Sequence, residues 1–176
     1  MKILIVVDMQ KDFIDGSLGT EEAQLIVKSV ENKVKSLDTD DKLYFTLDTH
    51  GEDYLNTQEG RKLPVVHCVK DSDGWQLDAS LKSYAENKAG DVICKPCFGS
   101  FELVHKLAKV LNENNVDEIE LVGLCTDICV ISNAMMIKSS FPEVTVSVDS
   151  SCCAGVTPES HNNALEAMKM CQIEVK

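Results

Sequence analysis

The feature that most constrains this fold is a regular alternation of short apolar runs with longer amphipathic segments along the whole chain. Strand-length runs separated by helix-length segments are typical of a parallel sheet that is covered by helices. We therefore predict an α/β protein with a six-stranded, mostly parallel sheet. The predicted strands are residues 2–8, 42–48, 91–94, 118–123, 144–148 and 173–175.

Three helices have clear start signals. Thr20 precedes two glutamates, Ser100 precedes Phe-Glu, and Thr157 precedes Pro-Glu. Hydroxyl side chains are favoured at the N-cap, and proline and acidic residues are favoured in the first turn, so we expect a helix after each. Residues 51–78 show no strong periodicity, and a long irregular loop inside a compact domain is usually functional.

Length and composition favour a single domain spanning residues 1–176. A chain of this length can bury about two thirds of the surface that it exposes when unfolded. Its 44% apolar and 26% charged residues are ordinary for a globular protein, which argues against a disordered or membrane-spanning chain. Neither an internal repeat nor a linker is visible in the sequence, so we expect one core.

The net charge of −12 argues against a nucleic-acid partner, because such affinity depends on Lys and Arg neutralising phosphates. The apolar run at residues 2–7 is too short for a signal-peptide core or a membrane span. We therefore expect a cytoplasmic protein that acts on a small molecule, with no membrane partner, and a homo-oligomer is compatible with the sequence. Its eight cysteines are expected to be reduced thiols.

Polar residues follow four of the predicted strands. Asp8 ends the first strand, Asp48 ends the second and is followed by His50, Lys95 follows the third, and residues 124–129 follow the fourth. In open α/β sheets, ligands bind outside the carboxyl ends of the strands. The sequence therefore predicts one site at this edge of the sheet.

Cys129 is the predicted nucleophile of that site. If Thr126 caps the next helix, Cys129 lies in the first turn, where free N–H groups and the helix dipole favour a thiolate and can hold an oxyanion. Asp8 can then exchange a proton with the sulfur, and Lys95 can keep both partners ionised. Taken singly, each residue has a simpler explanation: a packed cysteine, a turn-forming aspartate and a surface lysine.

A second cluster lies in and before the long loop. Asp48 and His50 are two apart on an extended segment and so point the same way, and Glu59 and His67 follow in the loop. Three protein ligands with open positions are the pattern of a catalytic metal site, and such a set suits Zn, Fe or Mn. The alternative is a pair of surface histidines without a metal.

The C-x-x-C segment formed by Cys94 and Cys97 supports a redox pair as a further alternative. It has no second pair to complete a zinc site, and it closes a strand instead of opening a helix. Four further cysteines are expected to be packing residues: Cys68, Cys152, Cys153 and Cys171. Two histidines on predicted helices are expected to be solvated: His105 and His161.

The motifs resemble those of the isochorismatase-like cysteine hydrolases. Residues 8–13, D-M-Q-K-D-F, resemble the family's opening D-x-Q-x-D-F, and residues 123–130, G-L-C-T-D-I-C-V, resemble its nucleophile segment. Lys95 with residues 98–101 resembles the catalytic-lysine stretch. The resemblance covers nearly the full chain and includes residues 149–158.

This resemblance implies a Rossmann-like three-layer α/β/α sandwich with the catalytic trio Asp8, Lys95 and Cys129. It also implies a cis peptide bond between Leu124 and Cys125, and an oxyanion hole made by the N–H groups of Cys125 and Cys129. The implied reaction is hydrolysis of a linear C–N amide bond through a cysteine thioester, with release of ammonia. The presence of Cys129 argues against the isochorismatase branch proper, whose vinyl-ether hydrolysis does not use a cysteine at this position.

The long loop resembles that of the nicotinamidase branch, which implies conversion of nicotinamide to nicotinic acid in NAD salvage. Asp48, His50 and His67 match its metal ligands, and Glu59 stands at the place of an additional one. A divalent metal is therefore implied, zinc first and Fe or Mn as alternatives. The aromatic walls of the substrate pocket are assigned to Phe13, with Tyr54 and Trp75 as further candidates.

Two departures from the branch bear on the substrate. Gly51 follows His50 where many nicotinamidases have proline, and residues 70–74 replace a more usual stretch that contains Gly-Thr. The first alternative is a cysteine amidase of the same superfamily for another small amide or a carbamoyl compound. An alternative of a different class is a non-enzymatic receiver-like signalling domain, although the chain lacks the acidic pair that such domains carry after the first strand.

Overall fold

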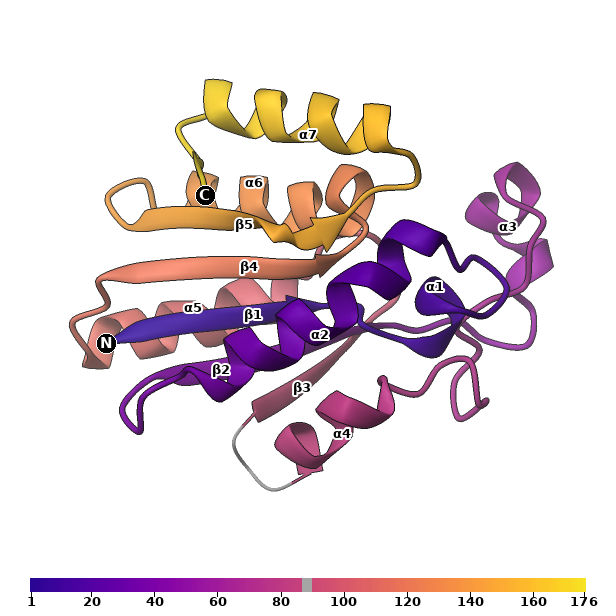
Figure 1. Cartoon of the computed structure of the whole chain (residues 1–176), viewed down its shortest axis with the longest axis horizontal. Coiled ribbons are helices and arrows are strands. Elements are labelled where there is room, and N and C mark those ends of the chain that lie inside the picture. The colour runs from indigo at the N-terminus through magenta and orange to yellow at the C-terminus, as the bar shows by residue number, and fades with distance from the viewer. Residues whose placement is uncertain (87–89) are drawn as a thin grey trace.

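The sheet has six strands in the order β3-β2-β1-β4-β5-β6, and each pairing between neighbours is parallel. The structure is a computed structural model that describes residues 1–86 and 90–176. The strands are β1 (Lys2–Val7), β2 (Lys42–Asp48), β3 (Gly90–Lys95), β4 (Glu118–Leu124), β5 (Thr145–Ala154) and β6 (Glu174–Val175). The predicted six-stranded parallel sheet is therefore confirmed (Figure 1).

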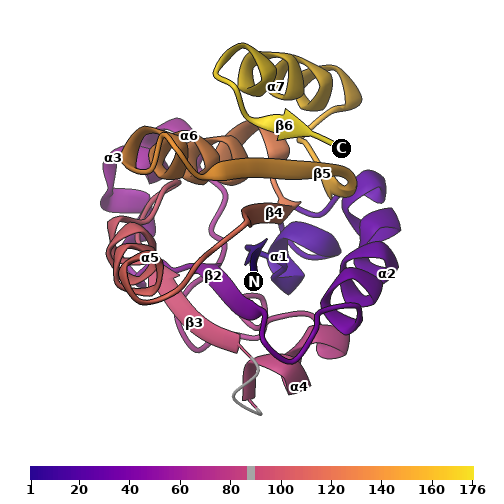
Figure 2. The same cartoon turned by 90° about the vertical axis from the view of Figure 1, so that its left-hand side faces the viewer.

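Helices cover both faces of this sheet, as Figure 2 shows for α5 and α6 on one side and α2 on the other. The segments are α1 (Lys11–Ile14), α2 (Glu21–Lys35), η1 (Tyr54–Asn56), α3 (Gln58–Lys62), α4 (Ala79–Glu86), α5 (Phe101–Glu113), η2 (Thr126–Val130), α6 (Ile131–Ser140) and α7 (Pro158–Met170). Among these helices, none combines the length and the apolarity needed to cross a membrane.

The central strand β1 shows why two layers of helices form. Successive side chains of a strand point to opposite faces, and β1 is apolar on both. Ile3 and Ile5 belong to the core that packs under α5, α6 and α7, whereas Leu4 and Val6 belong to the core under α2 and α4. All four are at most 1% exposed, so the sheet must be covered on both sides.

Strand β5 is longer than predicted. We expected it to end at Val148, but it continues to Ala154 and resumes pairing with β4 at Gly123 opposite Cys153. The register shifts between these two stretches, which marks a bulge. Polar residues in the bulged stretch, including Asp149, interrupt the apolar run, and this is why the sequence pattern ends too early.

The three helix starts are confirmed. The hydroxyl of Thr20 accepts a hydrogen bond from the N–H of Ala23, and that of Ser100 accepts from Leu103. Thr157 and Ser160 form a reciprocal capping box at the start of α7. These bonds satisfy N–H groups that the first turn of a helix leaves without an internal partner.

The Thr157 cap leads to a stability prediction. Thr157→Ala is expected to lower the free energy of unfolding by about 1 kcal/mol, because it removes the acceptor for the N–H of Ser160. Urea unfolding followed by circular dichroism measures the change. Ser139→Ala, at an exposed position in α6, is the control and is expected to change stability by less than about 0.5 kcal/mol. Equal effects of the two changes would contradict the cap assignment.

Candidate active site

The ends of four neighbouring strands, β3, β2, β1 and β4, bring the predicted catalytic residues together. Asp8 follows β1 directly, Lys95 is the last residue of β3, and Cys129 lies in η2 after β4. In the sheet register Asp48, the last residue of β2, pairs with Lys95. Residues that are far apart in the sequence thus meet at one edge, as the strand-end rule predicts.

Lys95 lies at the centre of this group. Its Nζ is 2.6 Å from Oδ2 of Asp8, 3.3 Å from Sγ of Cys129 and 3.6 Å from Oδ1 of Asp48. The Thr46 hydroxyl donates a 2.6 Å hydrogen bond to the other oxygen of Asp8. Each of these five side chains is buried, so one cation faces two carboxylates and a sulfur with little water to screen them.

Burial decides the protonation of this group. It raises the pKa of the Cys129 thiol well above its usual value, and the negative charge of Asp8 adds to the rise while Lys95 opposes it. Burial also raises the pKa of Asp8 against the opposing ion pair with Lys95. Burial opposes the charge of Lys95, but Asp8, Cys129 and Asp48 together raise its pKa. Burial and the charge of Asp8 thus favour the thiol form of Cys129, whereas the charge of Lys95 favours the thiolate that the sequence led us to expect.

The turn that carries the nucleophile differs from the prediction. Cys125, not Thr126, is the N-cap residue, and η2 is a π-helical turn without a side-chain cap. The Thr126 hydroxyl forms a 2.8 Å hydrogen bond with Nδ1 of His161 on α7. This bond to another helix explains why the hydroxyl does not cap its own. The peptide bond between Leu124 and Cys125 is cis, as the resemblance implied.

His161 and Cys171 also differ from expectation. His161 is half-buried, and burial lowers the pKa of its ring. It was expected to be solvated, as His105 is. Cys171 was expected to pack but is exposed where α7 ends, whereas Cys68, Cys152 and Cys153 are buried. The position of a residue on or next to a helix does not by itself say whether a neighbouring element covers its side chain.

Cys94 and Cys97, which flank Lys95 in the C-x-x-C segment, are both exposed free thiols. The side chain of Lys95 between them is 1% exposed and reaches the catalytic group. The Cys97 thiol lies 3.5 Å from the carbonyl of Gly99. The segment therefore brings a buried lysine to the site from between two exposed cysteines.

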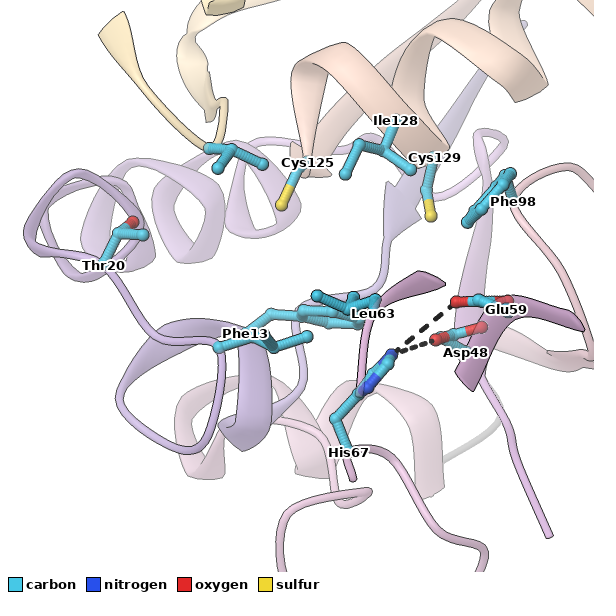
Figure 3. Close-up of a pocket in the computed structure, with 12 residues that line it drawn as sticks. Phe13, Thr20, Asp48, Glu59, Leu63, His67, Phe98, Cys125, Ile128 and Cys129 are labelled. Carbon is cyan, nitrogen blue, oxygen red and sulfur yellow. Dashed lines mark ion pairs between the residues drawn. The ribbon is translucent and has the colours of Figure 1, made fainter. Parts of the chain in front are cut away.

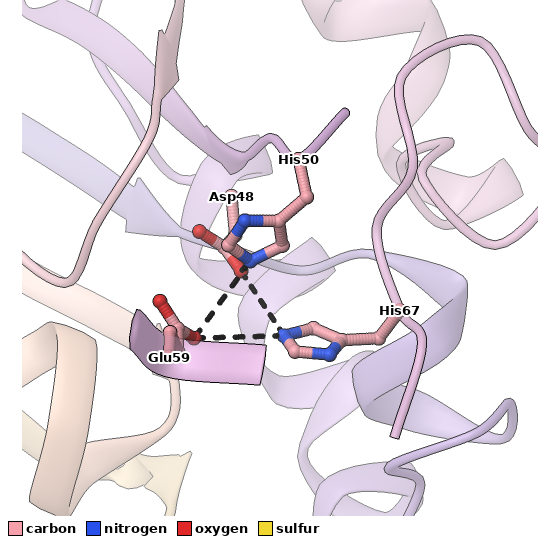
Figure 4. Close-up of side chains that lie close together, drawn as sticks. All are labelled: Asp48, His50, Glu59 and His67. Carbon is pink, nitrogen blue, oxygen red and sulfur yellow. Dashed lines mark hydrogen bonds and ion pairs between the residues drawn. The ribbon is translucent and has the colours of Figure 1, made fainter. Parts of the chain in front are cut away.

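A second cluster, formed by Asp48, His50, Glu59 and His67, offers four ligand atoms that all lie within 4.8 Å of one another (Figure 4). His50 Nε2 is 2.9 Å and His67 Nε2 is 3.5 Å from Oδ2 of Asp48. Oε1 of Glu59 lies 3.8 Å from His50 Nε2. Two imidazole nitrogens and two carboxylates are a donor set that suits a divalent transition metal.

Contacts around the cluster hold its ligands in orientation. His67 Nδ1 donates to the carbonyl of Val65 at 2.8 Å, which leaves Nε2 free to face the cluster. Tyr54 packs against both histidine rings, with centroids 4.6 Å from His50 and 4.9 Å from His67. Two carboxylates and two buried histidines placed this closely fit a metal better than a pair of surface histidines.

The opening D-x-Q-x-D motif has a structural explanation that sequence reasoning did not give. Gln10 donates from Nε2 to the carbonyl of Asp48 at 2.9 Å and accepts from the Asp48 N–H at 2.7 Å. Asp12 accepts from the N–H of Cys68, next to His67, at 2.7 Å. The motif thus supplies the carboxylate that contacts Lys95 and two residues that hold the segments of Asp48 and His67. The spacing was visible, but the partners are far away in sequence.

A pocket of about 210 Å³ opens between the two clusters (Figure 3). The thiols of Cys125 and Cys129 line one side, and Asp48, Glu59 and His67 line another. The apolar residues that line it are Phe13, Leu18, Leu63, Phe98, Ile128 and Val156. A flat apolar molecule with a polar group at each end would match this arrangement.

Among the predicted aromatic walls, only Phe13 lines the pocket. Tyr54 is fully buried behind the histidines and donates its hydroxyl to the carbonyl of Leu63. Trp75 donates its indole N–H to Thr49 at 2.9 Å and lies outside the pocket lining. Phe98, in the loop after β3, is a pocket aromatic that sequence reasoning missed, because its role depends on how that loop folds back.

Comparison with known proteins agrees with this geometry. The chain matches the family model of the isochorismatase domain over residues 2–175. It belongs to the isochorismatase family. A nicotinamidase of Saccharomyces cerevisiae is 27% identical over 99% of both chains. The family match and this relative confirm the predicted family. Neither finding supports the alternative of a receiver-like signalling domain.

Solved structures with the same fold include nicotinamidase-type enzymes. The pyrazinamidase/nicotinamidase of Streptococcus mutans superposes with a TM-score of 0.85 at 27% identity and covers 100% of both chains. The pyrazinamidase of Pyrococcus horikoshii, solved in complex with zinc, gives a TM-score of 0.81 at 27% identity over 99% and 98% of the two chains. The predicted isochorismatase-like α/β fold and its nicotinamidase branch are thereby confirmed.

Proposed function

We propose that this protein is a metal-dependent cysteine amidohydrolase that converts nicotinamide to nicotinic acid and ammonia. The observation that carries the proposal is that Cys129, which shares the contact of Lys95 with Asp8, lines the same pocket as Asp48, Glu59 and His67. Relatives that match the whole chain are nicotinamidases. A nicotinamide ring has a nitrogen and a carboxamide at separate positions, which fits the two polar ends of the pocket.

In the proposed reaction, Asp8 takes the proton of Cys129 as the sulfur attacks the amide carbon. The Asp8 carboxylate and the Cys129 sulfur both contact Nζ of Lys95, which brings the base and the thiol together. Because burial and the Asp8 charge raise the pKa of the thiol, Asp8 takes this proton as the bond to carbon forms. The backbone N–H groups of Cys125 and Cys129 are proposed to hold the oxyanion.

The same carboxyl group can then complete the cycle. Asp8 returns the proton to the amide nitrogen, the C–N bond breaks, and ammonia leaves a thioester on Cys129. A water molecule gives its proton to Asp8 and attacks the thioester, which releases the acid and restores the thiol. Lys95 keeps its charge throughout, since its pKa is raised, and it stabilises each anionic form of its neighbours.

Asp48, His50 and His67, with Glu59 as the fourth ligand, would hold the metal, with zinc as the first choice and iron or manganese as alternatives. When bound, the cation would act as a Lewis acid toward the ring nitrogen and so orient the substrate. The protein's own residues make this site stiff, because Gln10 and Asp12 hold two ligand segments.

Ammonia release from nicotinamide tests the proposal. The purified protein is expected to release ammonia as isolated, to lose this activity on chelation, and to recover it when zinc is added back. His67→Asn, which removes one ligand atom, is expected to abolish recovery. Thermal unfolding gives a second readout, because a metal that binds only the folded state raises the melting temperature of the chelated protein. Full activity after complete chelation would contradict the metal requirement.

Absence of ammonia with metal bound and the thiol reduced would contradict nicotinamide as substrate. In that case the pocket geometry favours another small planar amide or a carbamoyl compound, and a panel of such amides is the next assay. Ammonia release from one of them, lost in Cys129→Ala, would retain the amidohydrolase and change only its substrate.

A further inference from the structure

A second cavity lies next to the catalytic pocket. It has a volume of about 570 Å³, and we call it the outer chamber. Its lining is more polar and includes Lys62 of α3, Asp127 of η2 and Ser132 of α6. Four residues line both cavities, and we call them the collar: Glu59, Leu63, Phe98 and Ile128.

The collar is built from three segments that are far apart in the sequence. Glu59 and Leu63 come from α3 and its end, Phe98 from the loop after β3, and Ile128 from η2. Phe98 is 46% exposed and Leu63 is 38% exposed, although both line the apolar pocket. Figure 3 draws Phe98 and Glu59 at the end of the pocket where Cys129 lies. Side chains that face both cavities form the boundary between them.

The backbone around Phe98 is held independently of its ring. Asn133, which is 1% exposed, donates to the carbonyl of Phe98 at 3.0 Å and accepts from the N–H of Ser100 at 3.0 Å. The same amide donates to the carbonyl of Cys129 at 2.8 Å. The loop and the nucleophile turn are therefore joined through Asn133, and removing the Phe98 ring leaves these bonds in place.

We propose that the collar, and the Phe98 ring above all, sets the size of the substrate by limiting access to Cys129 to single-ring amides. Phenylalanine is the bulkiest collar residue, and packed side chains exclude a group that exceeds the space between them. Without this ring, the 210 Å³ pocket and the outer chamber join, so an amide with a second ring can place that ring in the chamber. The substrate part of this inference rests on the proposed function.

Selectivity between two amides tests the proposal. Nicotinamide is compared with nicotinamide that carries a phenyl group at ring carbon 5, which leaves the ring nitrogen and the carboxamide free. The wild type is expected to favour nicotinamide strongly. Phe98→Ala is expected to raise the ratio of kcat/KM for the phenyl amide over nicotinamide by about tenfold or more. Phe101→Ala is the matched control, since Phe101 is 75% exposed nearby and lines neither cavity.

Alkylation of Cys129 tests access without any assumption about the substrate. Iodoacetamide and a bulkier N-aryl iodoacetamide each form an S–C bond with loss of iodide, the thiol proton going to solvent. Peptide fragmentation in the mass spectrometer separates Cys129 from Cys125. The ratio of bulky to small labelling rates at Cys129 is expected to rise about tenfold in Phe98→Ala and to stay unchanged in Phe101→Ala.

The selectivity assay and the labelling assay together separate the hypothesis that nicotinamide is the substrate from the hypothesis that the collar limits access to Cys129. If the wild type does not hydrolyse nicotinamide but the labelling ratio rises, the proposed substrate fails and the collar is supported. If nicotinamide is hydrolysed and neither ratio responds to Phe98→Ala more than to Phe101→Ala, the collar is overturned. A wild type that takes both amides equally well also overturns it. Circular dichroism and the position of the urea transition check that each variant is folded.

Discussion

Changing Cys129 to alanine is expected to lower turnover by roughly four orders of magnitude or more while the fold is retained. The sulfur is the atom that forms the thioester in the proposed reaction, and neither Asp8 nor Lys95 can replace it as the nucleophile. The side chain is 4% exposed and loses only one heavy atom, so we expect a stability change of about 1 kcal/mol. Ammonia release and urea unfolding measure the two effects.

Cys153→Ala is the matched control for this variant. Cys153 lies on β5, is also 4% exposed, and belongs to the same core cluster as Cys129. It does not line the catalytic pocket, so the same substitution there is expected to cost similar stability and to leave turnover within a small factor. Activity retained in Cys129→Ala, or lost equally in both variants, would remove Cys129 as the nucleophile.

Changing Lys95 to methionine is expected to destabilise the protein by about 3–5 kcal/mol and to abolish turnover. Methionine has a similar length and fills the space, but it leaves the Asp8 and Asp48 carboxylates buried without the cation that faces them. Removing one partner of a buried ion pair is costly because the remaining charge has lost both water and its counter-charge. Urea unfolding at neutral pH measures the loss.

Two further variants separate charge from packing. Adding Asp8→Asn to Lys95→Met removes one of the stranded carboxylates and is expected to restore part of the stability without restoring turnover. Lys106→Met removes the 2.7 Å ion pair of a partly exposed lysine with Asp91 at the surface and is expected to cost about 1 kcal/mol or less. A Lys95→Met effect as small as this surface effect would contradict the buried ion-pair assignment.

Much of the fold could be predicted from the sequence because its signals are local. Strands β1 and β2 are apolar runs, and their predicted bounds agree with the structure to within one residue. The caps at Thr20, Ser100 and Thr157 bond to N–H groups three residues away. Interactions over such short separations depend on neighbouring residue types alone, so a reading of the sequence can find them.

The contact between Lys95, Asp8 and Cys129 could also be predicted, because strand ends in a parallel sheet meet at one edge. The strand-end rule could not predict the other contacts made by the residues around this site. The Thr126 hydroxyl bonds to His161, thirty-five residues later, instead of capping its own turn. Tyr54 packs against His50 and His67 instead of lining the pocket.

The sequence by itself thus determined the order of the elements, the sheet, the helix starts and the residue types at the catalytic edge. Only the tertiary structure decided that burial raises the pKa of Cys129, that Phe98 lines the pocket and that Gln10 holds Asp48. The physical reason is the range of the forces involved. Periodicity and caps act between near neighbours, whereas burial, a raised pKa and a pocket wall depend on which distant segments exclude water from the same place.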